Sequence, residues 1–212
     1  MITLDRKTYL DRRYRRVQSL VNRREQGLVA GLLAKIEPRP RQILDIPCGH
    51  GRFTPLLRPA AAERIVCSDL WQRHLDALAA AESAEGTPIL LRQADLLGRL
   101  PFDDREFDLV FDFRFFQHVS DDEQRRHAAA ELVRVSRRHL IVSYYRAGSL
   151  HTLQQSLRRV LRGRRYKVTF QRGAAFRALF TDLGCRVLGE SALLPFLHAQ
   201  RVLLVETPPA GS

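Results

Sequence analysis

Apolar positions along the chain repeat with two different periods, first helical and then strand-like. In residues 8–36 the apolar side chains recur at intervals of three, four or seven, with arginines around them, which predicts one long amphipathic helix. Pro38 and Pro40 follow this stretch and end it. Short apolar runs then alternate with helical stretches, which is typical of a parallel sheet covered by helices on both faces. We therefore expect one α/β domain preceded by a helical extension.

Seven short apolar runs carry the strand pattern. We expect strands in RQILDI, RIVCSD, PILLRQAD, FDLVFDF, HLIVSYY, CRVLGES and AQRVLLVET. Helices are expected between the earlier runs, including one over residues 121–135 that opens with a capping box of Ser120 and Glu123. Only a short link containing Pro195 joins the last two runs. These two runs are therefore predicted to pair as an antiparallel hairpin at the sheet edge.

Composition indicates a globular chain that folds without cross-links. The chain has 212 residues, 45% of them hydrophobic and 27% charged, and a chain of this length buries enough surface to fold unaided. No apolar run approaches the ~18 residues of a membrane span, and the charged opening lacks a signal-peptide core. Cys48, Cys67 and Cys185 are far apart in the sequence and form no Cys-x-x-Cys pair. We therefore expect buried thiols, no metal site and a cytoplasmic location.

Positive charge is the one unusual feature of the composition. Lysine and arginine number 35 against 23 aspartate and glutamate residues, for a formal net charge of +12. The excess is concentrated in residues 1–40 and 146–181, and the second stretch contains no acidic residue. Arginine presents a fork of donors that suits phosphate and carboxylate. The charge therefore indicates an anionic partner, although a solvated arginine-rich surface would have the same composition.

Acidic and glycine residues stand where the first three predicted strands end. Asp45 ends the first strand and is followed by Gly49 and Gly51, Asp69 ends the second strand, and Asp95 ends the third. Ligands of doubly wound sheets bind beyond these strand ends, where glycine lets the backbone approach closely and an acidic side chain can bind ribose hydroxyls. Taken singly, each of these residues is more typical of an ordinary turn or helix cap than of a ligand site.

Together these motifs resemble those of the class I S-adenosylmethionine-dependent methyltransferases. ILDIPCGHGRF is similar to the family's first motif, SDL to its second, ADLLGRLPFDDREFDLV to its third and fourth, and FFQHVSDDEQRRHAAAELVRV to the helix that follows. The resemblance implies a Rossmann-like, doubly wound, mostly parallel seven-stranded sheet closed by an antiparallel hairpin, with S-adenosylmethionine as cofactor. Residues 38–207 would form the methyltransferase domain. Residues 1–37 and an insert at about 147–170 would form basic lids over its mouth.

The resemblance also implies contacts at the methionine end of the cofactor. Asp45 would hold the amino group, directly or through a water. The backbone at Gly49 and Gly51 would pass beneath the cofactor, and Phe113 would line the methionine side near the methyl group. Pro47 stands where the family usually has glycine, which excludes a backbone N–H contact there.

At the adenosine end the resemblance implies four further contacts. Asp69 would bind the ribose, and Leu70 would pack against the adenine. Asp95 would bind the adenine amino group, and the amide of Leu96 would bind a ring nitrogen.

The reaction sets the expectation for catalytic and acceptor residues. An alcohol or amine acceptor must lose a proton, so a base near the methyl group is expected. His118, just after the fourth strand, is the candidate, although a histidine there more often caps the following helix or packs under the rim. Tyr145 is a second catalytic candidate, and Tyr14 and Arg146 are assigned to the acceptor. Neighbouring residues on a strand point to opposite faces, so Tyr144 or Tyr145 is expected in the core.

The two basic segments lead us to expect a small anionic molecule or a glycolipid as acceptor, with peripheral membrane contact. RNA is the alternative acceptor, because Tyr166 and Phe170 lie among basic residues and could stack on bases. A further interpretation is a non-catalytic cofactor-binding subunit that assists a partner. An NAD-dependent oxidoreductase is disfavoured by Thr54, where its fingerprint requires Gly or Ala.

Overall fold

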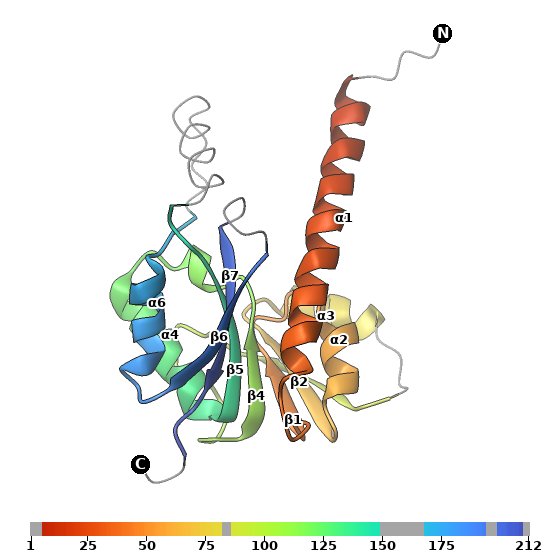
Figure 1. Cartoon of the computed structure of the whole chain (residues 1–212). Coiled ribbons are helices and arrows are strands. Elements are labelled where there is room, and N and C mark those ends of the chain that lie inside the picture. The colour runs from red at the N-terminus through yellow and green to blue at the C-terminus, as the bar shows by residue number, and fades with distance from the viewer. Residues whose placement is uncertain (1–5, 82–85, 149–167, 194–198, 210–212) are drawn as a thin grey trace.

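A twisted sheet with helices on both faces forms the centre of the protein (Figure 1). The computed structural model describes residues 6–81, 86–148, 168–193 and 199–209, with side chains from Ser19 onward. Within this part of the chain, seven strands form one sheet in the order β3-β2-β1-β4-β5-β7-β6. Their bounds are β1 Gln42–Asp45, β2 Arg64–Asp69, β3 Ile89–Gln93, β4 Phe107–Asp112, β5 Ser136–Tyr145, β6 Arg186–Ala192 and β7 Gln200–Glu206.

The pairing of the strands confirms the sheet predicted from the sequence. Strands β1 to β5 pair in parallel. Strand β7 runs antiparallel between β5 and β6, so that β6 forms the edge and the last two strands make the expected hairpin.

The helices form one layer on each face of the sheet. Figure 1 shows α4 and α6 on one face and α1, α2 and α3 on the other. Their bounds, with the two short 3-10 helices, are α1 Arg6–Leu33, α2 Thr54–Leu57, η1 Arg58–Ala60, α3 Gln72–Ala81, η2 Phe116–His118, α4 Asp122–Val135 and α6 Gly173–Thr181. The N-terminal half of α1 extends beyond the sheet, and its C-terminal half lies against it.

One predicted helix start was wrong by a residue. The N-cap of α4 is Asp121, whose side chain accepts a hydrogen bond from the backbone N–H of Gln124. Ser120 therefore does not cap the helix. Aspartate caps as well as serine does, and Asp121 stands at the position from which its carboxylate reaches the free N–H groups of the first turn.

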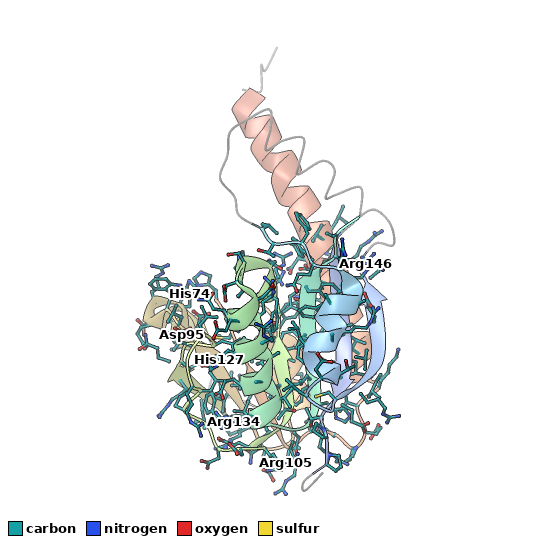
Figure 2. All side chains as sticks on the ribbon, turned by 90° about the vertical axis from the view of Figure 1, so that its left-hand side faces the viewer. His74, Asp95, Arg105, His127, Arg134 and Arg146 are labelled. Atoms are coloured by element: carbon teal, nitrogen blue, oxygen red, sulfur yellow. The ribbon has the colours of Figure 1, made fainter. Side chains whose placement is uncertain are left out.

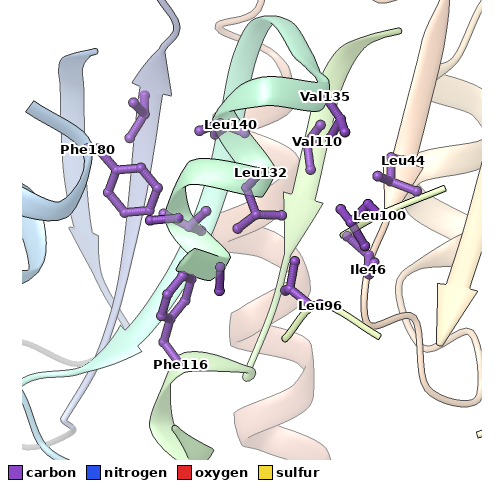
Figure 3. Packing of buried hydrophobic residues seen from close by; sticks show 14 of the residues in the cluster. Leu44, Ile46, Leu96, Leu100, Val110, Phe116, Leu132, Val135, Leu140 and Phe180 are labelled. Carbon is purple, nitrogen blue, oxygen red and sulfur yellow. The ribbon is translucent and has the colours of Figure 1, made fainter. Parts of the chain in front are cut away.

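Two apolar clusters fill the space between the sheet and the helix layers. On one face, Leu132 of α4 and Phe180 of α6 belong to a cluster with Val110 and Leu140 of the sheet (Figure 3). On the other face, Val29 of α1 is fully buried among side chains of α2, α3 and the central strands. The C-terminal half of α1 is therefore part of the core. Among the described residues, no helix is long and apolar enough to cross a membrane.

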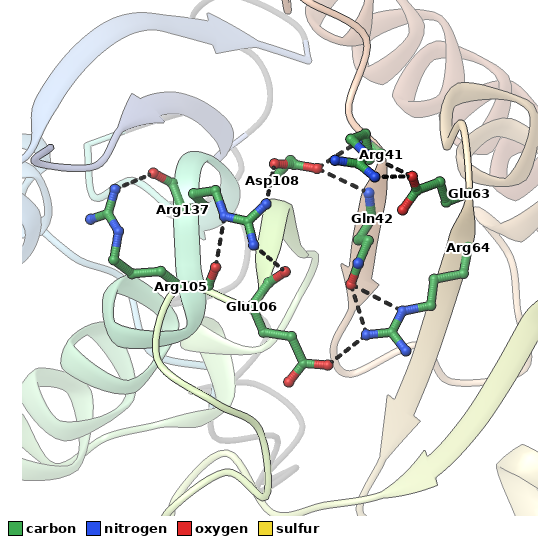
Figure 4. A network of polar contacts seen from close by, with 8 residues as sticks. All are labelled: Arg41, Gln42, Glu63, Arg64, Arg105, Glu106, Asp108 and Arg137. Atoms are coloured by element: carbon green, nitrogen blue, oxygen red, sulfur yellow. Dashed lines mark hydrogen bonds and ion pairs between the residues drawn. The ribbon is translucent and has the colours of Figure 1, made fainter. Parts of the chain in front are cut away.

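A polar network joins the strands at the end where β1 and β4 begin (Figure 4). The buried carboxylate of Asp108 accepts hydrogen bonds from the backbone N–H groups of Arg41 and Gln42 at 2.9 and 3.1 Å, and pairs with Arg137 at 3.1 Å. Arg64 of β2 donates to Glu106 at 2.8 Å. These contacts tie four strands together at one end of the sheet. The opposite end, where the same strands finish, holds the cavity.

Candidate active site

A cavity of about 1040 Å³ opens at the carboxyl ends of the parallel strands, walled by the segments after β1 to β4 and by α1. Several of the residues predicted from the sequence line it, namely Asp45, Gly49, Asp69, Leu70, Asp95, Leu96, Phe113 and His118. Among the described residues, Gly51, Tyr145 and Arg146 do not form its walls. The side chain of Tyr14 and the centre of the predicted basic lid, residues 149–167, lie outside the described residues.

The segment after β1 requires glycine at two positions. Gly49, with φ of +56°, and Gly51, with φ of +72°, both adopt the left-handed backbone that other residues rarely take. A Cβ on Gly51 would lie 2.3 Å from Cδ1 of Leu78, whereas a Cβ on Gly49 would meet open space. Packing of this segment directly on α3 is thus a reason for glycine at position 51 that the sequence did not reveal.

Asp69 is held in place by three donors of its own surroundings. Its Oδ2 accepts the backbone N–H of Gly49 at 2.9 Å, and its Oδ1 accepts that of Trp71 at 2.9 Å and lies 3.0 Å from Nδ1 of His74. His74 lines the cavity, and its ring centroid is 4.4 Å from that of His50. No sequence motif singled out His74, and its place in the first turn of α3, shortly after Asp69, was the only signal that the two side chains meet.

Asp95 combines a turn with a place in the cavity wall. Its Oδ1 accepts the backbone N–H of Leu97 at 2.9 Å, and its carbonyl accepts that of Gly98 at 3.0 Å. Figure 2 shows Asp95 near His74, at one side of the sheet end. Leu70 and Leu97 also line the cavity and are 44% and 39% exposed, whereas Leu96 is buried in the core. Exposed apolar side chains beside a carboxylate suit a flat ring that carries an amino group.

Asp45 lies in the floor of the cavity with an unsatisfied oxygen. It is buried, and its Oδ2 has no hydrogen-bond partner among the described residues. Burial and the nearby charge of Asp69 raise the pKa of Asp45 to about 8, while the positive charge of Arg52 acts in the opposite direction. The carboxyl is therefore poised to ionise when a positive group arrives.

Two arginines and a glutamate close the cavity beside α1. Glu25 is 1% exposed and pairs through Oε2 with Arg52, and through Oε1 with Nη2 of Arg114 at 2.6 Å. Asn22 accepts from Arg52 at 3.2 Å. Arg114 adopts φ of +69°, and its backbone N–H donates to Oγ of Ser143 at 2.7 Å. The two guanidinium groups share one carboxylate, so this wall carries a net positive charge, which the sequence analysis did not locate.

His118 lies in the same wall of the cavity as Arg114. Partial desolvation and the positive charge of Arg114 lower the pKa of His118. Its Nε2 lies 3.4 Å from Nε2 of Gln117, a contact in which a neutral imidazole nitrogen acts as acceptor. The side chain is therefore uncharged at neutral pH.

Strand β5 ends in two tyrosines that occupy different environments. Tyr144 is fully buried, and its hydroxyl donates to Oε1 of Glu190 at 2.7 Å. Tyr144 is therefore the core tyrosine. Tyr145 is half-buried with its ring centroid 6.0 Å from that of Phe170. Arg146 is exposed and lies at the α1 end of the sheet, far from Arg105 (Figure 2). The roles of Tyr145 and Arg146 stay predictions.

The chain is similar to proteins of known structure over most of its length. It is 17% identical to the magnesium protoporphyrin IX methyltransferase ChlM of Synechocystis PCC 6803 with bound SAH, over 91% of this chain and 87% of that one, with a TM-score of 0.74. A SAM-dependent methyltransferase of Methanosarcina mazei is 15% identical over 83% and 96% of the two chains, with a TM-score of 0.67. The [4+2]-cyclase SpnF is 14% identical over 86% and 80%, with a TM-score of 0.65. At these identities the likeness is one of fold.

In sequence, residues 43–139 match the model of a methyltransferase domain. No protein of curated function matches the chain. The matched residues run from β1 into β5 and include the acidic and glycine residues at the ends of the first strands. The sequence match to a methyltransferase domain and the likeness in fold together indicate a methyltransferase that uses S-adenosylmethionine as its cofactor.

Proposed function

We propose that the enzyme methylates an anionic small molecule or the anionic headgroup of a glycolipid, which enters the cavity beside α1. The observation that carries this proposal is the pair of guanidinium groups of Arg52 and Arg114 in the cavity wall, held against the single carboxylate of Glu25. Guanidinium groups bind carboxylates and phosphates through two parallel hydrogen bonds. A positive wall also raises the local concentration of anions at the mouth.

The acidic residues of the cavity suit the cofactor. The unpartnered Oδ2 of buried Asp45 is an acceptor for the α-amino group. Asp69 is oriented by three protein donors and keeps lone pairs for ribose hydroxyls, and Asp95 has one oxygen outside its turn for the adenine amino group. When bound, S-adenosylmethionine supplies an electrophilic methyl group on a sulfonium. The protein's part is to bind, to orient and to exclude water.

The remaining cofactor contacts are proposed on the basis of the family resemblance. Leu70 and the amide of Leu96 would border the adenine, and Gly49 would leave room above the segment that follows β1, while Gly51 lets that segment pack on α3. Phe113 packs against Phe53, with ring centroids 4.5 Å apart, and would form an apolar floor near the methyl group.

His118 is proposed to accept the proton that the acceptor releases. It lines the cavity beside Arg114 and is neutral at physiological pH, as a general base must be. Burial raises the pKa of Tyr145, so its hydroxyl stays protonated and would serve as a donor that orients the acceptor rather than as a base. Arg146 at the α1 end and Tyr14 on α1 would add contacts to the acceptor.

Transfer of label from [methyl-³H]S-adenosylmethionine to fractions of a cell extract tests the charge of the acceptor. The extract is divided into a lipid phase, an RNA fraction, and small molecules that an anion exchanger either retains or passes. We expect labelled product from the retained small molecules or from acidic lipids, with a KM that rises with ionic strength. Labelling only of the neutral or cationic fraction would refute the proposal.

The arginine pair is tested by Arg114→Gln beside Arg126→Gln, a change at an exposed arginine of α4 that does not line the cavity. Loss of one charge-assisted hydrogen-bonding group is expected to raise the KM for the acceptor by about tenfold or more, with a smaller effect on kcat. The Arg126→Gln variant should behave as the wild type. Equal KM values in the two variants would remove Arg114 from the acceptor site.

RNA is the less favoured acceptor on one specific observation. Phe170, one of the two aromatic residues thought to stack on bases, has its ring against that of Tyr145 at 6.0 Å, so it is already engaged within the protein. Tyr166, the other, lies outside the described residues. Label in the RNA fraction would reverse this preference. Tight cofactor binding without label in any fraction would favour the non-catalytic subunit.

A further inference from the structure

Two buried aspartates stand at the ends of the neighbouring central strands β1 and β4. In the parallel register Asp45 lies opposite Phe111, so Asp112 is one position further along the adjacent strand. Asp45 is in the cavity floor. Asp112 is fully buried and lies opposite Val142 of β5 in the register. Asp112 has no role among the contacts that the family resemblance implies.

Neither carboxyl is satisfied by the protein. Both oxygens of Asp112 and Oδ2 of Asp45 lack hydrogen-bond partners among the described residues. An ionised carboxylate without partners is strongly disfavoured in an apolar surrounding, and two such groups close together disfavour each other further. In the protein without ligand, the pair therefore holds protons at neutral pH.

The charged groups around Asp45 and Asp112 do not supply the missing hydrogen bonds or the positive charge that the two carboxylates would need. Asp69 of β2 adds negative charge, and the Cys48 thiol that borders Asp45 is itself held protonated. Arg52, the cation that acts on Asp45, is already paired with Glu25. Burial, and to a lesser extent the negative charge of Asp45, hold the pKa of Asp112 well above its usual range. Among the described residues, the one cation that acts on the pair is therefore already paired, and a cationic ligand can supply the missing counter-charge.

We propose that Asp45 and Asp112 form a proton-releasing pair that couples cofactor binding to pH and favours the cationic cofactor over its demethylated product. S-adenosylmethionine brings a sulfonium and an ammonium group, whereas the product keeps only the ammonium group. When the positive groups arrive, the pair ionises and releases a proton to solvent. Cofactor affinity then rises with pH, by at most about tenfold per pH unit for each proton released. This inference rests on the cofactor, not on the identity of the acceptor.

Titration calorimetry at about pH 7, in two buffers that differ in ionisation enthalpy, counts the protons released on binding. We expect wild-type protein to release protons with S-adenosylmethionine and fewer with S-adenosylhomocysteine. Asp112→Asn should reduce the proton release by about half or more and flatten the pH dependence of the affinity ratio between the two ligands. Asp76→Asn, at an exposed position of α3, is the matched control and should bind as the wild type does.

Three outcomes would overturn the proposal: equal binding enthalpies in both buffers, equal proton release with both ligands, or unchanged proton release in Asp112→Asn. Should that variant not fold, carbon-13 NMR titration of the aspartate carboxyl groups in wild-type protein gives the answer directly. We expect two carboxyls that titrate above the ordinary range without ligand, and at least one that is ionised with S-adenosylmethionine. Carboxyls that are already ionised at about pH 7 without ligand would also overturn it.

Discussion

Replacing Glu25 by glutamine removes the one carboxylate between two arginines without changing the size of the side chain. Glu25 projects from the part of α1 that lies on the domain, while Arg52 follows β1 and Arg114 follows β4. The three residues therefore join α1 to two strand ends that are far away in sequence. In Glu25→Gln, two guanidinium groups remain side by side with no counter-charge.

The distances and the burial of the three side chains determine how much Glu25→Gln lowers the free energy of unfolding. Opposite charges about 4 Å apart attract by about 4 kcal/mol at an effective dielectric constant of about 20. Glu25 has two such partners, although the arginines repel each other and each keeps about a third of its side chain exposed, 31% for Arg52 and 30% for Arg114. Removing one member of a buried pair costs ~3–5 kcal/mol. Discounted for solvent screening at the arginines, we expect a loss of about 2–3 kcal/mol in the free energy of unfolding.

Urea denaturation at low ionic strength measures this loss, with Glu63→Gln as the matched control. Glu63 pairs with Arg41 at the surface, where the two side chains are 42% and 70% exposed, so its replacement should cost less than about 1 kcal/mol. A second arm combines Glu25→Gln with Arg114→Gln, which removes the unpaired charge and should recover part of the loss. If Glu25→Gln destabilises the protein no more than Glu63→Gln, the buried cluster does not hold α1 on the domain.

Three further substitutions test separate parts of the fold and the site. Asp45 has its pKa raised from 3.8 to about 8 in the folded protein, so wild-type stability falls as pH rises through this interval, and Asp45→Asn escapes that loss. Without cofactor, the free energy of unfolding of the variant, measured by chemical denaturation, should rise by about 3 kcal/mol relative to that of the wild type between about pH 5 and about pH 7. Parallel pH profiles of the two proteins would contradict a buried, protonated carboxyl at Asp45. Gly51→Ala places a methyl group 2.3 Å from Leu78. The left-handed backbone at this position alone costs an alanine ~1–2 kcal/mol, so calorimetry should find weaker S-adenosylmethionine binding in the variant. Unaltered affinity and melting temperature would refute the packing argument. Phe176→Ala empties a fully buried position between Tyr144 and Phe180. It should lower the free energy of unfolding by ~3–5 kcal/mol without affecting the affinity for S-adenosylmethionine. A loss below about 1 kcal/mol would mean that neighbouring side chains move in to fill the cavity.

Features that depend on neighbouring residues in the sequence could be predicted from the sequence. Alternating apolar runs gave the strands, and the short link before AQRVLLVET gave the antiparallel hairpin. The residues at strand ends, such as Asp45 and Asp69, followed from the rule that ligands bind at that edge. Each of these inferences uses neighbours in sequence or the order of elements.

Residues that act through tertiary contacts were not predicted. Glu25 stands among polar residues of a helix and has the pattern of a solvated face, yet it is buried and pairs with two arginines that are distant in sequence. Asp112 follows an apolar run as a surface aspartate would, yet it is fully buried in the folded protein. The sequence indicated that one of two adjacent tyrosines enters the core but not which, because the register of β5 against β7 decides this for Tyr144.

Strand β7 has a consequence for how the protein is made. It follows every other element of the sheet in sequence, yet it lies inside the sheet, paired with β5 on one side and β6 on the other. During synthesis at about 5–20 residues per second, β5 therefore leaves the ribosome well before the strand that covers its open edge. For that interval the nascent chain presents an apolar, unpaired strand, which is the kind of edge that recruits other chains. We expect chaperone binding and aggregation to occur mainly while β5 is exposed and β7 has not yet been synthesised. Substitutions in β7 should therefore lower the yield of folded protein by more than their effect on the free energy of unfolding would predict.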